Sequence, residues 1–259
     1  MNESQPVAIV TGGAKGIGAA CAQMLGQAQF NVLLSYVNSQ AEANSIVSSC
    51  LEYGNDAACL KSDVSKDDDC VALAKTALDR WGRIDVLVNN AGITRFGDPS
   101  KLSTLNADDF EKIFSVNVTG TFQMTRAVST SMKGSPFASV VNISSHSGFS
   151  GIGSSIAYAA SKGALNTLTL SLARSLAPDI RVNAVCPGFV DTDWMKPKMD
   201  GQALEMFKQD VTSLAPLNRL VTPEEVAETV GWLALEGKSI TGQLIVIDGG
   251  AHLTLGSPI

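Results

Sequence analysis

Tyr158 and Lys162 form a pair whose residue types and spacing can do chemistry. They lie four positions apart, so on a helix they would share one face. A free tyrosine titrates at about pH 10, and a cation at about 4 Å in an effective dielectric of roughly 20 favours the phenolate by about 4 kcal/mol, or about three pKa units. Such a tyrosine can exchange a proton near neutral pH. An ordinary surface pair on a helix has the same spacing. The rest of the sequence must therefore distinguish a proton-transfer pair from a surface contact.

The composition favours one domain with a large buried core. The chain has 259 residues, of which 45% are hydrophobic and 17% charged, and it contains 23 glycines. These values suit alternating strands and helices joined by tight turns, so we expect a single domain over residues 1–259. The net charge of -6, with no segment rich in Lys and Arg, argues against a nucleic-acid partner.

The cysteines and the hydropathy pattern favour a cytoplasmic protein. Five cysteines are scattered along the chain without a Cys-x-x-Cys pair, which is typical of reduced thiols. No segment approaches about 18 uninterrupted apolar residues and no signal peptide is evident, so we expect no membrane association. The two histidines, His146 and His252, have no carboxylates at ligand spacing, so we expect no metal site.

Short apolar segments alternate with amphipathic ones along the whole chain. This alternation predicts a parallel sheet of about seven strands with helices on both faces. The expected strands are residues 7–10, 31–36, 56–61, 84–88, 139–143, 181–185 and 243–247, and the main expected helices are 40–53, 66–81, 107–132, 158–176 and one beginning near Thr222. No strand is expected between Pro187 and Pro216, and a segment of that length inside a compact domain predicts a lid over a site, at about 187–216.

A glycine-rich turn separates the first strand from the first helix. Gly12, Gly16 and Gly18 are spaced Gly-x-x-x-Gly-x-Gly. Backbone amides and the positive end of a helix at such a turn can receive a pyrophosphate, and glycine lets the ligand approach the backbone. A purely structural turn is the alternative.

The chain resembles the short-chain dehydrogenase/reductase family over essentially its full length. The matching segments, in order, are the glycine turn, Asn89-Asn90-Ala91-Gly92, Asn117, Ser145, Tyr158 with Lys162, and Pro187-Gly188. The resemblance implies a Rossmann-type doubly wound α/β fold. It also implies an oxidoreductase that transfers hydride between a nicotinamide and a carbonyl or alcohol carbon.

The resemblance assigns catalytic roles to Asn117, Ser145, Tyr158 and Lys162. Tyr158 is implied to donate the proton in carbonyl reduction, and Lys162 to lower the pKa of Tyr158 and to bind the nicotinamide ribose. Ser145 is implied to donate a hydrogen bond to the substrate oxygen, in preference to its neighbour Ser144. Asn117 is implied to hold a water that relays protons from Lys162, with a helix-interrupting hydrogen bond as its structural alternative.

The resemblance also implies a set of cofactor contacts. Asn89 is expected mainly to be a structural residue near the adenosine that ties neighbouring strands. Asp63 is expected to contact the adenine amino group, Thr192 to bond the nicotinamide carboxamide, and Ile17 to pack beneath the cofactor. The full set of expected cofactor-binding residues is Gly12, Lys15, Gly16, Ile17, Gly18, Tyr36, Asp63, Val64, Asn90, Ala91, Gly92, Tyr158, Lys162, Pro187, Gly188, Val190 and Thr192.

Two positions favour NADP(H) over NAD(H). NAD-preferring members usually carry an acid at the end of the second strand, where this chain has Tyr36. Lys15 stands where NADP-preferring members place a basic side chain, and its ammonium can neutralise a 2'-phosphate. NAD(H) is the alternative, because Asn38 and Ser39 after the second strand offer the phosphate no second cation.

The substrate is expected to be a small molecule with a ketone or 3-oxoacyl group. Asn89-Asn90-Ala91-Gly92-Ile93-Thr94-Arg95 is similar to the 3-oxoacyl-[acyl-carrier-protein] reductase branch, although sugar, steroid and other alcohol dehydrogenases share the pattern. A catalytically silent cofactor-binding regulator is the alternative from another class. The last strand resembles the one that pairs subunits in the family, so a homotetramer, or a dimer, is expected.

Overall fold

A single parallel sheet forms the centre of the protein. The computed structural model describes residues 5–196, 198–199 and 201–254. The sheet has seven strands in the order β3-β2-β1-β4-β5-β6-β7, and every neighbouring pair is parallel. The strands are β1 (Val7–Val10), β2 (Asn31–Tyr36), β3 (Ala57–Lys61), β4 (Val86–Asn89), β5 (Ser139–Ile143), β6 (Arg181–Pro187) and β7 (Leu244–Ile247).

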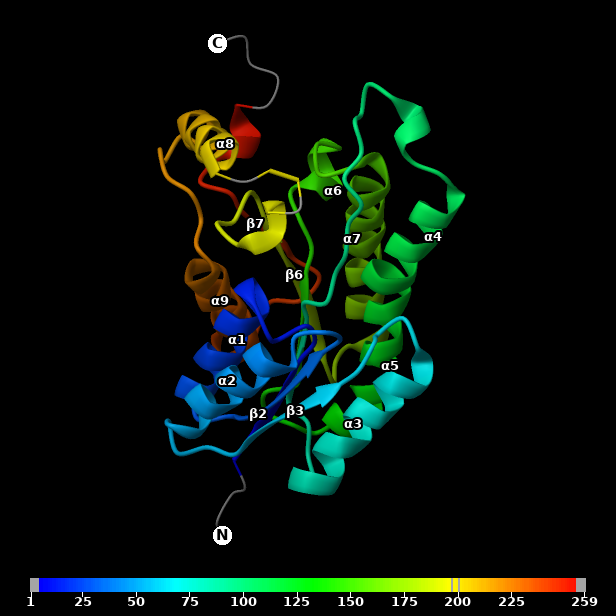
Figure 1. Ribbon diagram of the computed structural model, residues 1–259. Coiled ribbons are helices and arrows are strands. Elements are labelled where there is room, and N and C mark those ends of the chain that lie inside the picture. The colour runs from blue at the N-terminus through cyan, green and yellow to red at the C-terminus, as the bar shows by residue number, and fades with distance from the viewer. Residues whose placement is uncertain (1–4, 197, 200, 255–259) are drawn as a thin grey trace.

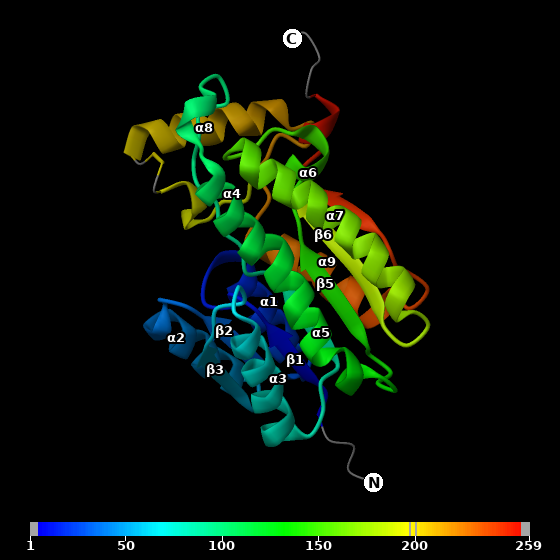
Figure 2. The same ribbon diagram turned by 90° about the vertical axis from the view of Figure 1, so that its right-hand side faces the viewer.

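Helices cover both faces of the sheet, as expected for a doubly wound α/β domain (Figures 1 and 2). One face carries α1 (Gly16–Gln27), α2 (Gln40–Leu51) and α9 (Pro223–Gly231). The other carries α3 (Asp67–Trp81), α4 (Ala107–Phe114), α5 (Thr121–Met132) and α7 (Ile156–Leu176). The central strands are buried on both faces, which explains why they are apolar without alternation.

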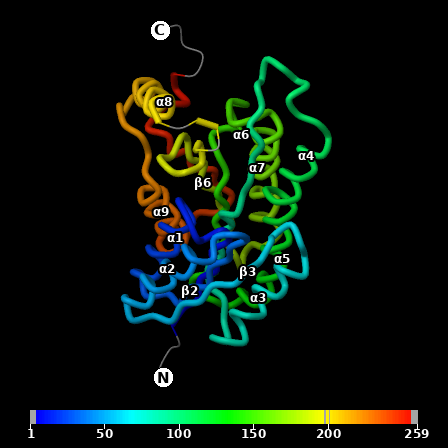
Figure 3. The backbone as a smooth tube through the Cα atoms, in the orientation of Figure 1, coloured from blue at the N-terminus to red at the C-terminus, as the bar shows by residue number. Residues whose placement is uncertain are grey.

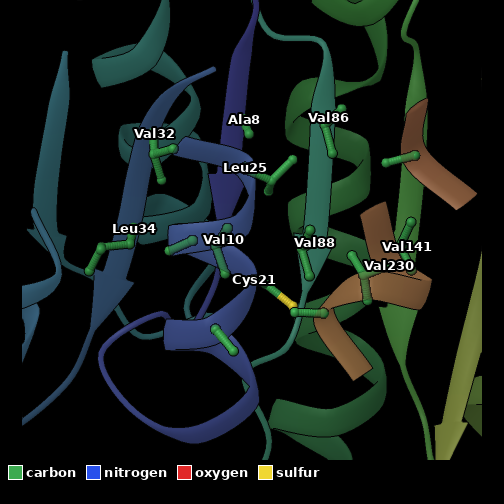
Figure 4. Close-up of a cluster of buried hydrophobic side chains, with 14 of the residues drawn as sticks. Ala8, Val10, Cys21, Leu25, Val32, Leu34, Val86, Val88, Val141 and Val230 are labelled. Carbon is green, nitrogen blue, oxygen red and sulfur yellow. The ribbon is translucent and has the colours of Figure 1, made fainter. Parts of the chain in front are cut away.

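The core is divided by the sheet into two clusters. Figure 4 shows one of them, where Val10, Leu25 and Val230 lie between the sheet and helices α1 and α9. The second cluster packs the opposite face of the sheet against α3, α5 and α7, with Leu73 and Val128 among its members. Both layers hold the strands in place, so their carboxyl ends form a rigid edge.

The strand order predicts a ligand crevice at that edge. The chain runs outward from β1 to β3 and then returns to β4 on the other side of β1. Such a reversal leaves a crevice at the carboxyl ends of the strands, where ligands bind in doubly wound folds. The short helix α6 (Ser147–Ser150) and α8 (Gly201–Leu214) lie at this end of the molecule (Figure 3).

Most expected elements agree with the structure to within two residues at each end, and the following differ further or bear on the site. The expected helix 107–132 is interrupted by a π-helical turn, Ser115–Gly120, between α4 and α5. The expected strand 84–88 is observed as Val86–Asn89, and just before it the buried Asp85 carboxylate accepts a hydrogen bond from Val7 N at 2.8 Å. The segment 187–216 is partly helical, with a 3-10 turn at Asp193–Met195 followed by α8.

A chain of buried polar side chains connects the sheet to the helices below the site. Asn89 Nδ2 donates to Asn142 Oδ1 at 2.9 Å and to Thr125 Oγ1 at 3.1 Å. Asn142 Nδ2 in turn donates to Thr169 Oγ1 at 2.9 Å. The expected role of Asn89 in tying neighbouring strands is therefore present, and it extends to α5 and α7.

We expect Asn142→Ala to lower the free energy of unfolding by about 2 to 3 kcal/mol, because Asn89 and Thr169 lose a partner where water has no access. Urea denaturation followed by circular dichroism measures the change. Thr167→Ala, an exposed change on the same helix as Thr169, is the control and should stay within about 0.5 kcal/mol of the wild type. An equally small effect of Asn142→Ala would show that the chain contributes little to stability.

Candidate active site

The four expected catalytic residues come together above the carboxyl ends of β4 and β5. Asn117 lies in the π-helical turn, Ser145 follows β5, and Tyr158 and Lys162 lie on α7. Asn117 and Lys162 are almost fully buried, with exposed fractions of 1% and 4%. Separate elements, each anchored in the core, therefore present one cluster of polar groups.

The start of α7 orients Tyr158. The Ser155 hydroxyl caps the helix by accepting from Tyr158 N at 3.1 Å. Lys162 lies one turn later, with Nζ 5.6 Å from the centroid of the Tyr158 ring. The ring of Trp194, from the 3-10 turn, lies on another side of Tyr158 at 5.8 Å between centroids. The tyrosine is thus held between the helix and the segment 187–216.

Burial dominates the electrostatics of the pair. Burial raises the pKa of Tyr158 to about 12, and the hydrogen bond with Ser145 opposes this rise. Burial also lowers the pKa of Lys162 to about 8, while Nζ donates to Ile143 O at 2.7 Å. Loss of hydration dominates the pKa of both groups and the ammonium donates to a backbone carbonyl, so the lowering of the tyrosine pKa by Lys162 stays a prediction.

The neighbouring serines Ser144 and Ser145 have different partners. Ser144 Oγ donates to Asn166 Oδ1 at 2.6 Å, on the inner side of α7. Ser145 Oγ bonds Ser147 Oγ and accepts from Ser147 N, both at 3.1 Å, and it interacts with Tyr158. Of the two hydroxyls, Ser145 is therefore the one beside the phenol.

Asn117 fixes the loop that follows β4. Its Oδ1 accepts from Ile93 N at 2.9 Å, and its Nδ2 donates to Ile93 O at 3.0 Å and to Ser161 Oγ at 3.0 Å. A Cβ on Gly92 would lie 3.8 Å from Lys162 Nζ, so this loop passes close to the ammonium. The π-helical turn and these bonds match the structural alternative, and the water relay stays a prediction.

The glycine turn is held open by Asn90. Asn90 Nδ2 donates to Thr11 O at 3.0 Å and to Gly12 O at 2.9 Å. A Cβ on Gly18 would lie 2.4 Å from the same amide, so only glycine fits there. Gly12 also has φ +63°, which favours glycine. Gly16 and Ile17 begin α1, so amide groups at the start of that helix face the crevice.

Segments distant in sequence border the turn. A Cβ on Gly16 would lie 3.2 Å from Thr192 Cγ2, which brings the segment after Pro187 and Gly188 next to the glycine turn. Thr192 Oγ1 accepts from Trp194 N at 3.3 Å and so caps the 3-10 turn. Ala91 N donates to Thr11 Oγ1 at 3.0 Å, and Val190 forms an isolated bridge with Val221.

The outer end of the crevice lies over β2 and β3. Tyr36 is the last residue of β2 and is half-buried, and Val64 is buried just after β3. Asp63 Oδ1 accepts from Ser65 N and Oγ, at 3.1 Å and 2.7 Å. Lys15 Nζ pairs with Glu42 Oε1 at 2.6 Å. Glu42 was not predicted from the sequence, although an acidic residue in the first turn of the helix that follows β2 could have indicated it.

These features fit a dinucleotide. The glycines leave room for a ligand close to the backbone, and the amides at the start of α1 and the lysine beside the turn suit phosphates. Thr192 lies beside the turn and Trp194 beside Tyr158, so one short segment joins the two parts of the site. Among the described residues, no His, Cys, Asp and Glu side chains form a group of three able to hold a metal ion. No described helix is long and apolar enough to cross a membrane.

The fold and the site define an oxidoreductase that uses a nicotinamide dinucleotide at a carbonyl or alcohol carbon. Residues 12–252 match the family described as Enoyl-(Acyl carrier protein) reductase. The chain belongs to the short-chain dehydrogenase/reductase family, and it acts on CH-OH or C=O groups with NAD(P).

Several relatives cover nearly the whole chain. A 3-oxoacyl-[acyl-carrier-protein] reductase from Synechocystis is 36% identical over 247 residues, which is 94% of this chain and 96% of that protein. Glucose 1-dehydrogenase 2 from Bacillus subtilis is 34% identical over 249 residues, 95% and 94% of the two chains. A short chain dehydrogenase from Burkholderia cenocepacia, solved with NADP, is 32% identical with a TM-score of 0.86, covering 97% of this chain and 100% of that one.

Proposed function

We propose that the protein reduces a ketone or 3-oxoacyl group with NADPH. The observation that carries the proposal is the convergence of the Tyr158 and Ser145 hydroxyls beside a buried Lys162. Two hydroxyls that can both donate to one acceptor suit the oxygen of a carbonyl, where negative charge develops during reduction. The Synechocystis relative's name supports the same reaction.

The residues divide the reaction between them. When bound, the nicotinamide supplies or accepts hydride. Tyr158 donates the proton to the substrate oxygen, and Ser145 holds that oxygen by a hydrogen bond as negative charge develops. Lys162 supplies positive charge beneath the site and binds the ribose, and Asn117 holds the adjoining loop and a water that returns the proton from solvent. In alcohol oxidation the same groups act in reverse.

We propose that the segment 187–216, of which residues 197 and 200 lie outside the described residues, closes over the ligand as a lid. Trp194 contacts the ring of Tyr158, and Phe189 packs edge-on against Phe207 of α8 at 5.2 Å. These aromatic groups favour a fairly apolar substrate of medium size. Oxidation of a sugar is the second candidate, supported by the similarity to glucose 1-dehydrogenase 2.

A substrate panel distinguishes these candidates from a regulator without activity. NADPH consumption is followed with 3-oxoacyl thioesters and small ketones, and NAD(P) reduction with glucose and simple alcohols. We expect kcat/KM to be highest for the 3-oxoacyl and ketone substrates. Faster oxidation of glucose would favour the sugar dehydrogenase, and binding of NADPH without turnover of any substrate would favour the regulator.

In this proposal, Lys15 causes the protein to prefer NADP(H) over NAD(H). We expect Lys15→Ala to weaken NADPH binding by about tenfold or more and NADH binding by less than about twofold, because a charge-assisted contact with the 2'-phosphate is lost. Equilibrium titration of nucleotide fluorescence gives both dissociation constants. Lys75→Ala, an exposed change on α3, is the control. Equal losses for the two nucleotides would contradict this role.

We also propose that the protein is a cytoplasmic homotetramer, or a dimer. All five cysteines are free thiols, which supports a reducing compartment. Apolar side chains are exposed on α4, α5 and α7 (Phe110, Phe122 and Leu170), and β7 is a partly exposed apolar edge strand. Such surfaces favour association. Size-exclusion chromatography with light scattering measures the mass, and a monomer would contradict the proposal.

A further inference from the structure

Lys15 is bonded to a carboxylate that comes from another helix. Lys15 Nζ and Glu42 Oε1 lie 2.6 Å apart, and both side chains are about half exposed. Lys15 precedes α1 at the end of the glycine turn, whereas Glu42 lies in the first turn of α2. The hydrogen bond with Lys15 lowers the pKa of Glu42, so the carboxylate is charged at neutral pH. The pair therefore spans the space between the glycine turn and the end of β2.

The Lys15 side chain does not stabilise the start of α1 as a helix cap. It occupies the N-cap position of α1 but makes no side-chain cap hydrogen bond. A second carboxylate lies within electrostatic range, because Lys15 contributes to the lowered pKa of Asp193 on the 3-10 turn. Asp193 is itself paired with Lys196 at 2.6 Å. Glu42 is thus the direct partner of Lys15.

The position of the pair matters for the adenosine end of a dinucleotide. In folds of this type the adenosine ribose lies where the glycine turn meets the end of the second strand. A 2'-phosphate there carries a charge of about -1.5 to -2 at neutral pH. A ribose hydroxyl carries none. A 2'-phosphate must therefore compete with Glu42 for Lys15, and it must also approach the negative charge of the Glu42 carboxylate.

We propose that Glu42 is a specificity-determining residue that competes with the 2'-phosphate for Lys15 and so limits the preference for NADP(H) over NAD(H). The inference rests on the proposed role of Lys15 in binding that phosphate. Removing this competition is expected to change NADPH affinity by only a small factor, because the ion pair is exposed, and repulsion between the carboxylate and the phosphate adds to the effect. NAD(H) binding is not opposed in this way.

The test is a set of binding measurements on the whole protein. Dissociation constants for NADPH and NADH are measured by nucleotide fluorescence in the wild type, Glu42→Gln, Lys15→Ala and the double variant. Glu42→Gln keeps the size of the side chain and removes its charge. Asp79→Asn is the matched control, because it removes an equal charge from another exposed lysine pair, with Lys75, near the far end of α3. Thermal melting without nucleotide confirms that each variant is folded.

We expect Glu42→Gln to tighten NADPH binding by about three- to tenfold and to change NADH binding by less than about twofold. The gain should shrink when Lys15 is also replaced and at high salt, where exposed charges are screened. Asp79→Asn should alter neither constant by more than about twofold.

The contrary outcomes separate the inference from the function on which it rests. If Lys15→Ala weakens NADPH selectively but Glu42→Gln changes nothing, the competition is refuted and the role of Lys15 stands. If Lys15→Ala has no selective effect, both are refuted. If Glu42→Gln weakens NADH binding, Glu42 accepts hydrogen bonds from the ribose hydroxyls instead, and the inference is overturned.

Discussion

Tyr158→Phe lowers kcat by about a thousandfold while the dissociation constant for NADPH changes by less than about threefold. This is the result we expect, because the change removes the proton donor and leaves the ring against Trp194. Positioned general acids contribute about 10² to 10⁴ in rate. Single-turnover measurements of NADPH oxidation with the best substrate from the panel give the rate of the chemical step, and fluorescence titration gives the binding.

Tyr53→Phe is the matched control for this prediction. Tyr53 is exposed, and its hydroxyl accepts from Gln27 Nε2 at 2.8 Å far from the crevice. The control should retain wild-type turnover. If Tyr158→Phe retained more than about a tenth of the activity, Tyr158 would not be the proton donor, and Ser145 or a water molecule would have to take that place.

Lys162→Met is expected to lower kcat/KM by at least about a hundredfold and yet to stabilise the protein without nucleotide. Activity falls because the charge beneath Tyr158 and the contact with the ribose are lost. Stability rises because the wild type must bury an ammonium, as the lowering of its pKa from 10.5 to about 8 indicates. That difference corresponds to a cost on the order of 3 kcal/mol for burying the ammonium. The hydrogen bond to Ile143 O, which the substitution removes, contributes about 1 kcal/mol in the opposite direction.

The stabilisation by Lys162→Met should depend on pH, because Lys162 has different pKa values in the folded and unfolded states. Between about pH 8 and pH 10.5 the unfolded chain keeps a proton on Lys162 that the folded protein has released. The unfolded state then binds more protons, so wild-type stability rises with pH across that interval. The advantage of Lys162→Met should be complete below about pH 8 and should disappear as the pH approaches 10.5. Chemical denaturation at several pH values measures it.

Lys75→Met is the control for the stability measurement, since Lys75 is exposed and paired with Asp79 on α3. Its effect should be small and nearly independent of pH between 8 and 10. A destabilisation by Lys162→Met at pH 7 would show that the hydrogen bond to Ile143 outweighs the cost of burial.

The parts of the fold that the sequence predicts are those governed by local pattern. Parallel strands buried on both faces are short apolar runs, so β1, β2 and β5 were located at their observed bounds. The helical spacing of Tyr158 and Lys162 also follows from local structure, and Ser155 supplies the cap. The segment around the pair was therefore predictable as a helix before any tertiary contact was known.

The features that were missed depend on contacts between distant residues. The pKa of Lys162 depends on burial beneath the loop after β4, which no spacing within α7 reveals. The pairing of Lys15 with Glu42 requires the relative placement of α1 and α2. The interruption of the expected helix 107–132 accompanies the bonds between Asn117 and Ile93, 24 positions away in sequence.

The π-helical turn Ser115–Gly120 has a consequence for how this site can change during evolution. Such a turn holds one more residue than the α-helical turn it replaces. Loss of a single residue there would let α4 and α5 join as one regular helix, with little cost to the fold. The same loss would remove the bulge that holds the Asn117 amide against the backbone of Ile93. The length of this one turn therefore separates an intact active site from a well-folded chain that lacks one.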